Sequence, residues 1–492
     1  AIYSGLKDYQ VTLNTEVNNM VEKINSLGQK IYNLNKGIVK VEAEGVERSN
    51  DLRDSRDLAL DELSKYIDID YYETKDGEVI VSAENVPFIT KNDIAKMSVR
   101  EEGTYGLLIP QWEGYQQDVY NFDKQANNAN DTDKGKLKGL LIARGVIEVN
   151  YTDIPVMPER ADYDLTTEQG MAEYNSAMDA YQQKQDYYNK YIEPSAILSA
   201  IAGFDKLVNG IVTAMNDVLC PETTMDTTKE LTDADGNILK AEKYVYNAST
   251  HDVLYDSHGN VVAGKENGDG TYSYEASEKL YVDANHEETE NIDSMTYKIL
   301  DMSKAGYGMD DDETRGVELF KRNGTDRYKQ ITGADGSTIY VRNNLNVTGF
   351  ETDYTLGNLI VNPEASQNVG TLPLSTEHGK EDFSKVNELI DTFSNKFASL
   401  NPENYAKADF NTFYNDYIGE FATMGSVLTK YVNNQTTMVN GYDNQRLQTS
   451  GVSSDEELQK MIKYQHAYNA ASRYINVVSE MIEHLVTSLG HA

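Results

Sequence analysis

The sequence has little of what most catalytic and nucleic-acid-binding proteins need. Its 492 residues include one cysteine and seven histidines, and 44 basic residues stand against 80 acidic ones, a formal net charge of −36. With Cys220 alone, no disulfide within the chain and no thiolate metal cluster can form. So acidic a chain leaves little scope for the clustered Lys and Arg that bind phosphates. Nucleic acid and anionic membranes are therefore poor candidates for partners.

Long hydrophobic runs are also missing. No run reaches the roughly eighteen apolar residues of a membrane-spanning helix, and the N-terminus lacks a basic start followed by an apolar stretch. The sequence therefore predicts neither membrane insertion nor a cleavable secretion signal. Because the chain opens on Ala1 and not on methionine, we expect that a preceding segment has been removed. Its length and its 39% of apolar residues are those of a folded chain of several domains.

Motifs for catalysis fail on inspection. His286-Glu287-Glu288 begins like a zinc-protease helix, but Glu290 stands where the second histidine ligand is needed. The sequence has no G-x-S-x-G elbow and no G-x-x-x-x-G-K-[ST] or G-x-G-x-x-G phosphate loop. We therefore expect no enzyme, no catalytic residue and no cofactor. An enzyme domain within residues 221–376 would need a convergent polar pocket that a sequence cannot reveal.

One acidic loop partly resembles a calcium site. Between Leu231 and Glu242, the residues Asp233, Asp235 and Glu242 occupy carboxylate positions of a twelve-residue calcium loop, but Leu231 stands at the first position. The missing carboxylate favours a plain hairpin turn at Asp235-Gly236. A secreted calcium-binding adhesin stays an alternative, which a calcium-dependent shift of the melting temperature would reveal.

Apolar spacing divides the N-terminal part into helix and strand. Residues 6–34 carry a heptad stripe, and a shorter amphipathic helix follows from Asn50, its expected N-cap, to Tyr66. From Thr74 to Ile89 the period changes to two, which predicts a hairpin turned at Asp76-Gly77. Further on, residues 166–192 read as a polar helix and 197–218 as an apolar one.

Between Pro221 and Thr376, Asp-Gly and His-Gly turns separate short strand-like segments. Helical spacing returns with two expected long helices, one over Phe383–Phe397 and one from Phe410 to Val432, and Gly441 and Gly451 are expected to break the pattern. A last helix should begin at Ser453 or Ser454 and continue to about Leu489.

The last helix carries an apolar stripe without a nearby partner in the sequence. Over about 35 residues it spans roughly 50 Å, more than one small domain covers. We therefore expect it to pack against helices from the other chain end or against other subunits. The predicted assembly surface consists of Leu458, Met461, Tyr464, Gln465, Tyr468, Ala471, Ile475, Ile482 and Leu485.

The predicted fold class is α+β and multidomain, with a long helical bundle or coiled-coil domain formed by both chain ends and β-rich material inserted between them. In the first half, we expect residues 1–75 to form the N-terminal part of the helical domain and 76–134 a small β-rich hairpin region. Residues 135–220 should form a helical segment returning to the helical domain, with a polar helical insertion near 155–195. We expect 221–377 to form an outer β-rich domain, 378–445 the C-terminal part of the helical domain, and 446–492 the C-terminal assembly helix.

Three stretches resemble the family of flagellar hook-associated protein 1, which joins hook to filament. They are "INSLGQKIYNLNKGI" (24–38), "SNDLRDSRDLALDELSKYIDID" (49–70) and "SGVSSDEELQKMIKYQHAYNAASRYINVVSEMIEHL" (450–485). The C-terminal pattern is shared with other rod, hook and junction proteins, whereas the helical-domain motif narrows the resemblance to this family. The motif residues are Asn50, Leu52, Asp54, Arg56 and Asp57.

The resemblance implies a structural subunit of the bacterial flagellum that leaves the cell by flagellar type III export, without a cleaved signal peptide. It implies extracellular assembly through terminal helices, with other copies in a ring, neighbouring hook and filament-side junction proteins, and a cytoplasmic export chaperone at the C-terminal helix. Because the family's N-terminal helix is absent, the chain looks truncated at that end. A flagellin-like filament subunit is the alternative within the same system. From the residues alone, Asp54, Arg56 and Asp57 are expected to form local salt bridges.

Overall fold

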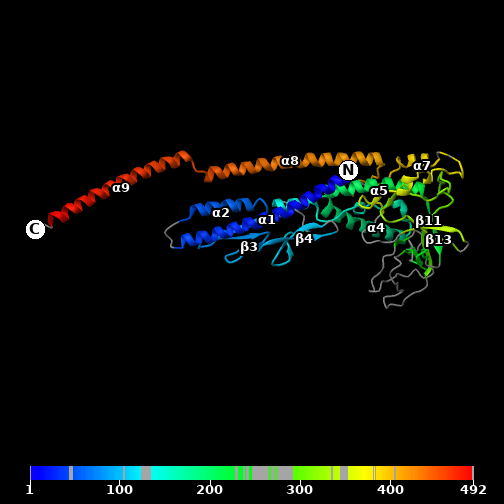
Figure 1. The fold of residues 1–492 in the computed structure, drawn as a ribbon, viewed down its shortest axis with the longest axis horizontal. Helices are drawn as coiled ribbons and strands as arrows, with labels where there is room; N and C mark the ends of the chain where they lie inside the picture. The colour runs from blue at the N-terminus through cyan, green and yellow to red at the C-terminus, as the bar shows by residue number, and fades with distance from the viewer. Residues whose placement is uncertain are drawn as a thin grey trace. The chain divides into compact units, whose positions relative to one another are not determined.

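The computed structural model describes residues 2–489 except 44–47, 104–105, 123–133, 228–230, 237–238, 240–242, 247–264, 267–271, 274–291, 334–335, 344–352, 381, 383 and 404–405. The chain divides into two compact units, residues 1–421 (unit 1) and 422–492 (unit 2). The predicted α+β class is confirmed, because long helices stand near both chain ends and small antiparallel sheets come between them in sequence (Figure 1).

The N-terminal part of unit 1 is built around one long helix, α1 (Ile2–Glu42). Along it lie α2 and two three-stranded antiparallel sheets, and Figure 1 shows α2 and the strands β3 and β4 beside α1. The bounds are α2 Asn50–Leu63, β1 Ile69–Glu73, β2 Val79–Ala83, β3 Val86–Ile89, β4 Met97–Glu102, β5 Leu107–Trp112 and β6 Gln117–Asp118. The predicted turn at Asp76-Gly77 connects β1 to β2, and β3 adds a strand to the expected hairpin.

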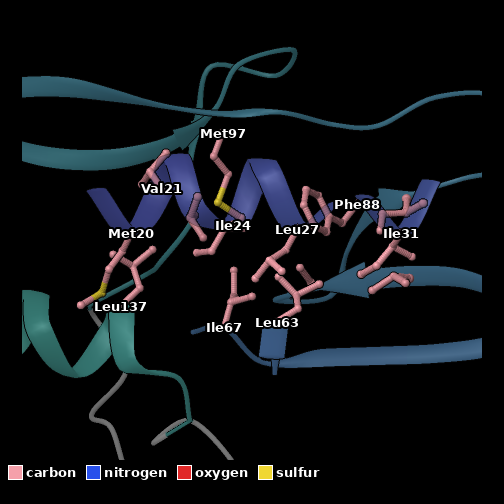
Figure 2. Packing of buried hydrophobic residues seen from close by; sticks show 14 of the residues in the cluster. Met20, Val21, Ile24, Leu27, Ile31, Leu63, Ile67, Phe88, Met97 and Leu137 are labelled. Atoms are coloured by element: carbon pink, nitrogen blue, oxygen red, sulfur yellow. The ribbon is translucent and has the colours of Figure 1, made fainter. Parts of the chain in front are cut away.

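The heptad stripe of α1 is the centre of this core. Ile24 and Ile31 have no exposed surface, and Figure 2 shows Ile24 and Leu27 among side chains from α2, α3 and the strands. Close packing also explains Gly28, because a Cβ there would lie 2.5 Å from the Phe88 ring. The apolar stripe at the N-terminal end is therefore buried within unit 1.

Polar side chains on the same helix replace missing strand partners. The Asn35 carboxamide donates to the Val79 carbonyl (2.8 Å) and accepts from the Val79 N–H (3.0 Å). Asn25 makes the same pair of hydrogen bonds with Met97, at 2.8 and 2.9 Å. Asn14 donates to the Gly106 carbonyl and accepts from the Leu108 N–H. The three asparagines thus fix the position of α1 on β2, β4 and β5, since each satisfies two backbone groups.

The next helices complete this part of unit 1. Their bounds are α3 Lys136–Arg144, α4 Glu168–Tyr187 with a π turn Tyr188–Ile192, and α5 Ala196–Leu219, with short 3-10 turns at Tyr151–Asp153 and Arg160–Asp162. The polar helix α4 is anchored by Tyr181, whose hydroxyl donates to the Pro402 carbonyl. Among the described residues, α5 is the one helix apolar and long enough to cross a membrane, but half of its most apolar window is buried. Its buried face contacts α1, α3 and α7, as a core helix does.

The region after Cys220 is β-rich, as expected. Strands β7, β8, β11, β13 and β14 form an antiparallel sheet, β12 pairs with β15, and β9 pairs with β10. The bounds are β7 Glu222–Thr227, β8 Lys243–Tyr246, β9 Lys265–Glu266, β10 Tyr272–Ser273, β11 Ile292–Leu300, β12 Phe320–Arg322, β13 Tyr328–Thr332, β14 Thr338–Arg342 and β15 Leu359–Val361. The short turns α6 Pro363–Gln367 and Val369–Thr371 follow. Of the Asp-Gly and His-Gly turns that the sequence predicts here, those at His258-Gly259 and Asp269-Gly270 lie outside the described residues, as does Asp335 of the one at Asp335-Gly336.

The expected long helix over Phe383–Phe397 is wrong, because α7 covers only Ser384–Thr392. Beyond it the chain turns, and the Phe397 N–H donates to the Ala408 carbonyl (3.0 Å). The Phe397 ring packs on Phe410 and Phe413, with centroids 4.4 and 5.1 Å apart. The phenylalanine that continued the helical spacing therefore belongs to an aromatic cluster formed after the chain has turned back.

Helix α8 (Phe410–Ser450) begins in unit 1 and continues into unit 2, where α9 (Ser454–Leu489) follows it. The break expected at Gly441 does not occur, because one glycine costs an exposed helix only about 1 kcal/mol. The break expected near Gly451 is confirmed, and α9 has the predicted bounds.

Candidate assembly surface

The start of α9 shows why the chain becomes helical again after Gly451. The Ser453 side-chain oxygen accepts from the Glu456 N–H at 3.4 Å, and the Ser453 carbonyl accepts from the Glu457 N–H at 3.0 Å. Acidic residues fill the first turn, where the positive end of the helix dipole favours them. Of the two serines predicted as candidates for the cap, Ser453 and Ser454, the structure shows Ser453 in that role.

The apolar stripe of α9 is exposed along its length. Tyr468 is 75% exposed and Ile475 62% exposed, compared with no exposed surface at Ile24 in the stripe of α1. The other predicted assembly residues, Leu458, Met461, Tyr464, Gln465, Ala471, Ile482 and Leu485, are exposed as well. Large apolar side chains that recur at helical spacing on an exposed face are typical of a surface that another helix covers.

The second predicted group, the motif on α2, supports the fold of unit 1. The Arg56 side chain is 2% exposed and donates to the Gly77 carbonyl (2.7 Å) and to Glu73 Oε2 (3.0 Å). It therefore attaches α2 to the β1–β2 turn. At Gly77 the backbone φ is +85°, and a Cβ there would lie 3.0 Å from the Arg53 guanidinium.

Arg53 reinforces this attachment, although the sequence did not single it out. It makes a bidentate pair with Glu42 at 2.8 and 2.7 Å and donates to Glu73 Oε1 at 2.7 Å. Hydrogen bonds from Arg53 and from the Ser49 backbone lower the pKa of Glu42 well below its ordinary value. Burial raises the pKa of Glu73, but its interactions with the two arginines outweigh this and lower it. A local charge cluster therefore joins α1, α2 and β1.

The other motif residues lie at the surface. Asp54 and Asp57 are exposed and Leu52 is half-buried, with Asp57 3.6 Å from Arg56. Asn50 is not the N-cap, because Ser49 occupies that position and directs its backbone N–H and its hydroxyl to Glu42. The structure thus brings Arg56 into a cluster, while Asn50 and Asp54 stay outside it.

Five structural residues were also not predicted from the sequence: Asn14, Asn25, Asn35, Arg53 and Arg144. Arg144 is fully buried and donates to Asn14 Oδ1 and to the Leu108 carbonyl, and burial lowers its pKa to about 10. A signal existed for the asparagines, since they recur at nearly equal steps within an apolar helix face. Their partners lie far along the chain, which no spacing rule identifies.

The calcium-loop candidate has only part of its carboxylates within the described residues. The Asp235 N–H donates to Asp233 Oδ1 (3.1 Å), and the Leu239 N–H donates to the Leu231 carbonyl (2.8 Å), as in a hairpin turn. Glu242 and the zinc-like stretch at His286 lie outside the described residues. Within the part that the structure describes, no three His, Cys, Asp or Glu side chains gather as a metal site.

A polar cavity of about 550 Å³ lies in the β-rich region beside Arg327. Arg327 pairs with Asp217 (3.0 Å) and Glu222 (2.9 Å) and donates to the Tyr354 hydroxyl (2.9 Å). Burial raises the pKa of Cys220 to about 12, so this thiol is not a nucleophile at neutral pH. The ion pairs around Arg327 hold the sheet and the end of α5 together.

Comparison with known proteins gives matches at both chain ends. Residues 1–177 match the family model of the flagellar hook-associated protein FlgK helical domain, and residues 443–488 match that of the flagellar basal body rod FlgEFG protein C-terminal. Over 78 residues the chain is 36% identical to flagellar hook-associated protein 1 of Bacillus subtilis (strain 168), a segment that covers 16% of this chain and 15% of that protein. The flagellar hook junction protein FlgK from Burkholderia pseudomallei is similar in structure with a TM-score of 0.38 and 12% identity, covering 92% of this chain and 87% of that one.

Proposed function

Because the chain belongs to the flagellar hook-associated protein FlgK family, we propose that it is a structural subunit that connects the hook to the filament of the bacterial flagellum. The family is structural and not enzymatic, and the protein is an extracellular component of the flagellum. The observation that carries the proposal is the exposed apolar stripe of α9, which coincides with the C-terminal family match.

The stripe gives the subunit an assembly surface. Side chains such as Tyr468 and Ile475 would become buried against helices of neighbouring copies in a ring, or of hook and filament-side junction proteins. Burial of each large apolar side chain contributes about 1.5–3 kcal/mol. An exposed face of this kind promotes aggregation before assembly. A cytoplasmic export chaperone that binds α9 would cover it, and type III export would then deliver the chain outside the cell.

The remaining regions follow from this proposal. Arg53 keeps α2 on α1 through Glu42, and Arg56 keeps it on β1 through Glu73, so these two residues serve the helical domain. The β-rich segment 221–377 would form the outer domain of the subunit.

The test is complementation in a strain whose only junction protein is this one. Ile475→Asp places a charge in the stripe, and the matched control Asn476→Asp places the same charge on the neighbouring exposed position. We expect Ile475→Asp to abolish swimming and to release filament protein into the medium, while Asn476→Asp swims normally. Circular dichroism of the purified variants checks that both stay folded. Normal motility of folded Ile475→Asp would contradict the proposal.

A flagellin-like filament subunit predicts a different result in the same strain. Loss of a filament subunit shortens or removes the filament but leaves other filament proteins attached at the hook. If the Ile475→Asp strain releases intact filament protein into the medium, the result supports a junction subunit and excludes a flagellin-like filament subunit.

A further inference from the structure

Unit 2 contains a second exposed apolar stripe, on α8. Apolar side chains recur there at alternating steps of three and four residues, the spacing of a coiled-coil seam. Gln435 interrupts the seam and Met424 is half-buried. The seam consists of Met424, Leu428, Tyr431, Gln435, Met438 and Tyr442, of which Leu428, Tyr431, Met438 and Tyr442 are 51–64% exposed.

The stripes of α8 and α9 are in register about Ser453. Met438 and Tyr468 lie equally far from it along the chain, and the same holds for the pair Tyr431 and Ile475 and for the pair Met424 and Ile482. Three further pairs lie between these and are also equally far from Ser453: Tyr442 and Tyr464, Gln435 and Ala471, and Leu428 and Val478. Equal separations from a turn are what two antiparallel helices of a hairpin require.

The connection between the helices has the length and chemistry of such a turn. Only Gly451, Val452 and Ser453 separate α8 from α9, a connection as short as those of known helical hairpins. A Cβ at Gly451 would lie 2.2 Å from the Leu447 carbonyl oxygen, so the helix end there accepts only glycine. Ser453 then caps α9.

Charge and shape fit the same pairing. Beyond Met461, the charged side chains Lys463, Arg473, Glu480 and Glu483 all stand outside the heptad seam of α9. On α8, Tyr431 and Gln435 of the seam line one side of a shallow groove of about 330 Å³ that lies beside the seam, together with Val432 and Val439. In the register above, Ala471 and Ile475 would lie opposite Gln435 and Tyr431, at the edge of this groove, with a small and a medium side chain.

We infer that in the free subunit α9 folds back on α8 as an antiparallel helical hairpin that turns at residues 451–453 and covers the assembly stripe. The tether favours α8 over a second copy as the occupant, because a short linker gives an effective concentration near millimolar. A binding partner of α9 then has to displace α8. The inference rests on unit 2 alone and does not depend on which partner that is.

Distance measurement between spin labels tests the hairpin in the full chain. Labels at Lys430→Cys and Arg473→Cys, in a Cys220→Ser background, lie outside both seams. In the hairpin the helix axes are about 8–10 Å apart, so we expect a label distance of roughly 20 Å. With α8 and α9 continuing end to end, the two positions would be about 60 Å apart. A distribution centred on this longer distance would overturn the inference.

Two controls separate the hairpin from other contacts. Dilution with unlabelled chain leaves an intramolecular distance unchanged, so loss of the short distance on dilution would mean pairing between copies and would refute the hairpin. Tyr431→Asp places a charge in the seam and should convert the short distance to a long one. Thr429→Asp, on an exposed position outside the seam, should keep it. Equal behaviour of the two variants would also refute it.

Discussion

Replacement of Asn35 by alanine should loosen unit 1 far more than the size of the change suggests. The side chain is 2% exposed, and its two hydrogen bonds satisfy both the N–H and the carbonyl of Val79. Alanine removes both bonds and leaves two backbone groups without that partner at a buried position. The residues of β2 itself are unchanged in this variant, so a change in the protection of Val79 is due to the loss of the asparagine side chain.

The magnitude follows from those two groups. An unsatisfied buried backbone group costs about 1–3 kcal/mol, so two of them cost roughly 2–6 kcal/mol. Because every 1.4 kcal/mol is a factor of ten, the exchange rate of the Val79 amide should rise by about 30-fold to 20,000-fold. The exposed Asn33, two residues away on the same helix, is the matched control, and its alanine variant should change exchange little.

Amide hydrogen exchange with resolution at β2 is the assay, because it reads the local opening without assuming that unit 1 unfolds in one step. A less than threefold change at Val79 in Asn35→Ala, or an equal change in Asn33→Ala, would refute the assignment of Asn35 as a substitute strand partner.

Two further predictions concern buried charges. Arg56→Ala should lower the free energy of unfolding by about 2–4 kcal/mol, because it removes two charge-assisted hydrogen bonds, one of them to the partly exposed Glu73. Thermal unfolding measures this change. In the same experiment Asp57→Ala, the control, should have little effect. Asp205 is 2% exposed, and burial raises its pKa to about 6 although the Tyr151 and Leu356 N–H groups donate to it. Because the folded state then binds the proton more tightly, this residue's contribution of about 3 kcal/mol is fully present below pH 4 and is lost as the pH rises through 6. The stability difference between the wild type and Asp205→Asn should therefore change between pH 4 and pH 7, and a difference independent of pH would contradict the assignment.

The sequence predicted those elements whose pattern is local. The heptad stripe of α1, the turn at Asp76-Gly77 and the cap at Ser453 depend on residues within a few positions of one another, and all are observed. It did not distinguish a stripe that packs inside unit 1, as on α1, from one whose side chains are exposed in the structure, as on α9, because both have the same spacing.

Errors arose where distant contacts decide the structure. Phe397 has helical spacing but packs in an aromatic cluster after the chain has turned. The break expected at Gly441 is an error of another kind, because a single glycine costs an exposed helix only about 1 kcal/mol and α8 continues through it. The hydrogen bonds of Asn25 and Asn35 reach 72 and 44 residues along the chain, which makes them invisible to any local pattern.

The roles of the predicted site residues divide in the same way. Arg56 lies in a cluster with defined partners, so its contribution is to the fold. The residues of the α9 stripe, such as Tyr468 and Ile475, have large exposed apolar surfaces, and their proposed role depends on a partner.

The most direct test of the account is to locate the protein on isolated flagella. A gold-labelled antibody against a tag inserted at the exposed position Gly379 in the loop before α7 can be imaged by electron microscopy on flagella that retain hook and filament. A junction subunit predicts label at a single site, between hook and filament, on each flagellum. Label spread along the filament, or absent from flagella altogether, would contradict the proposed function.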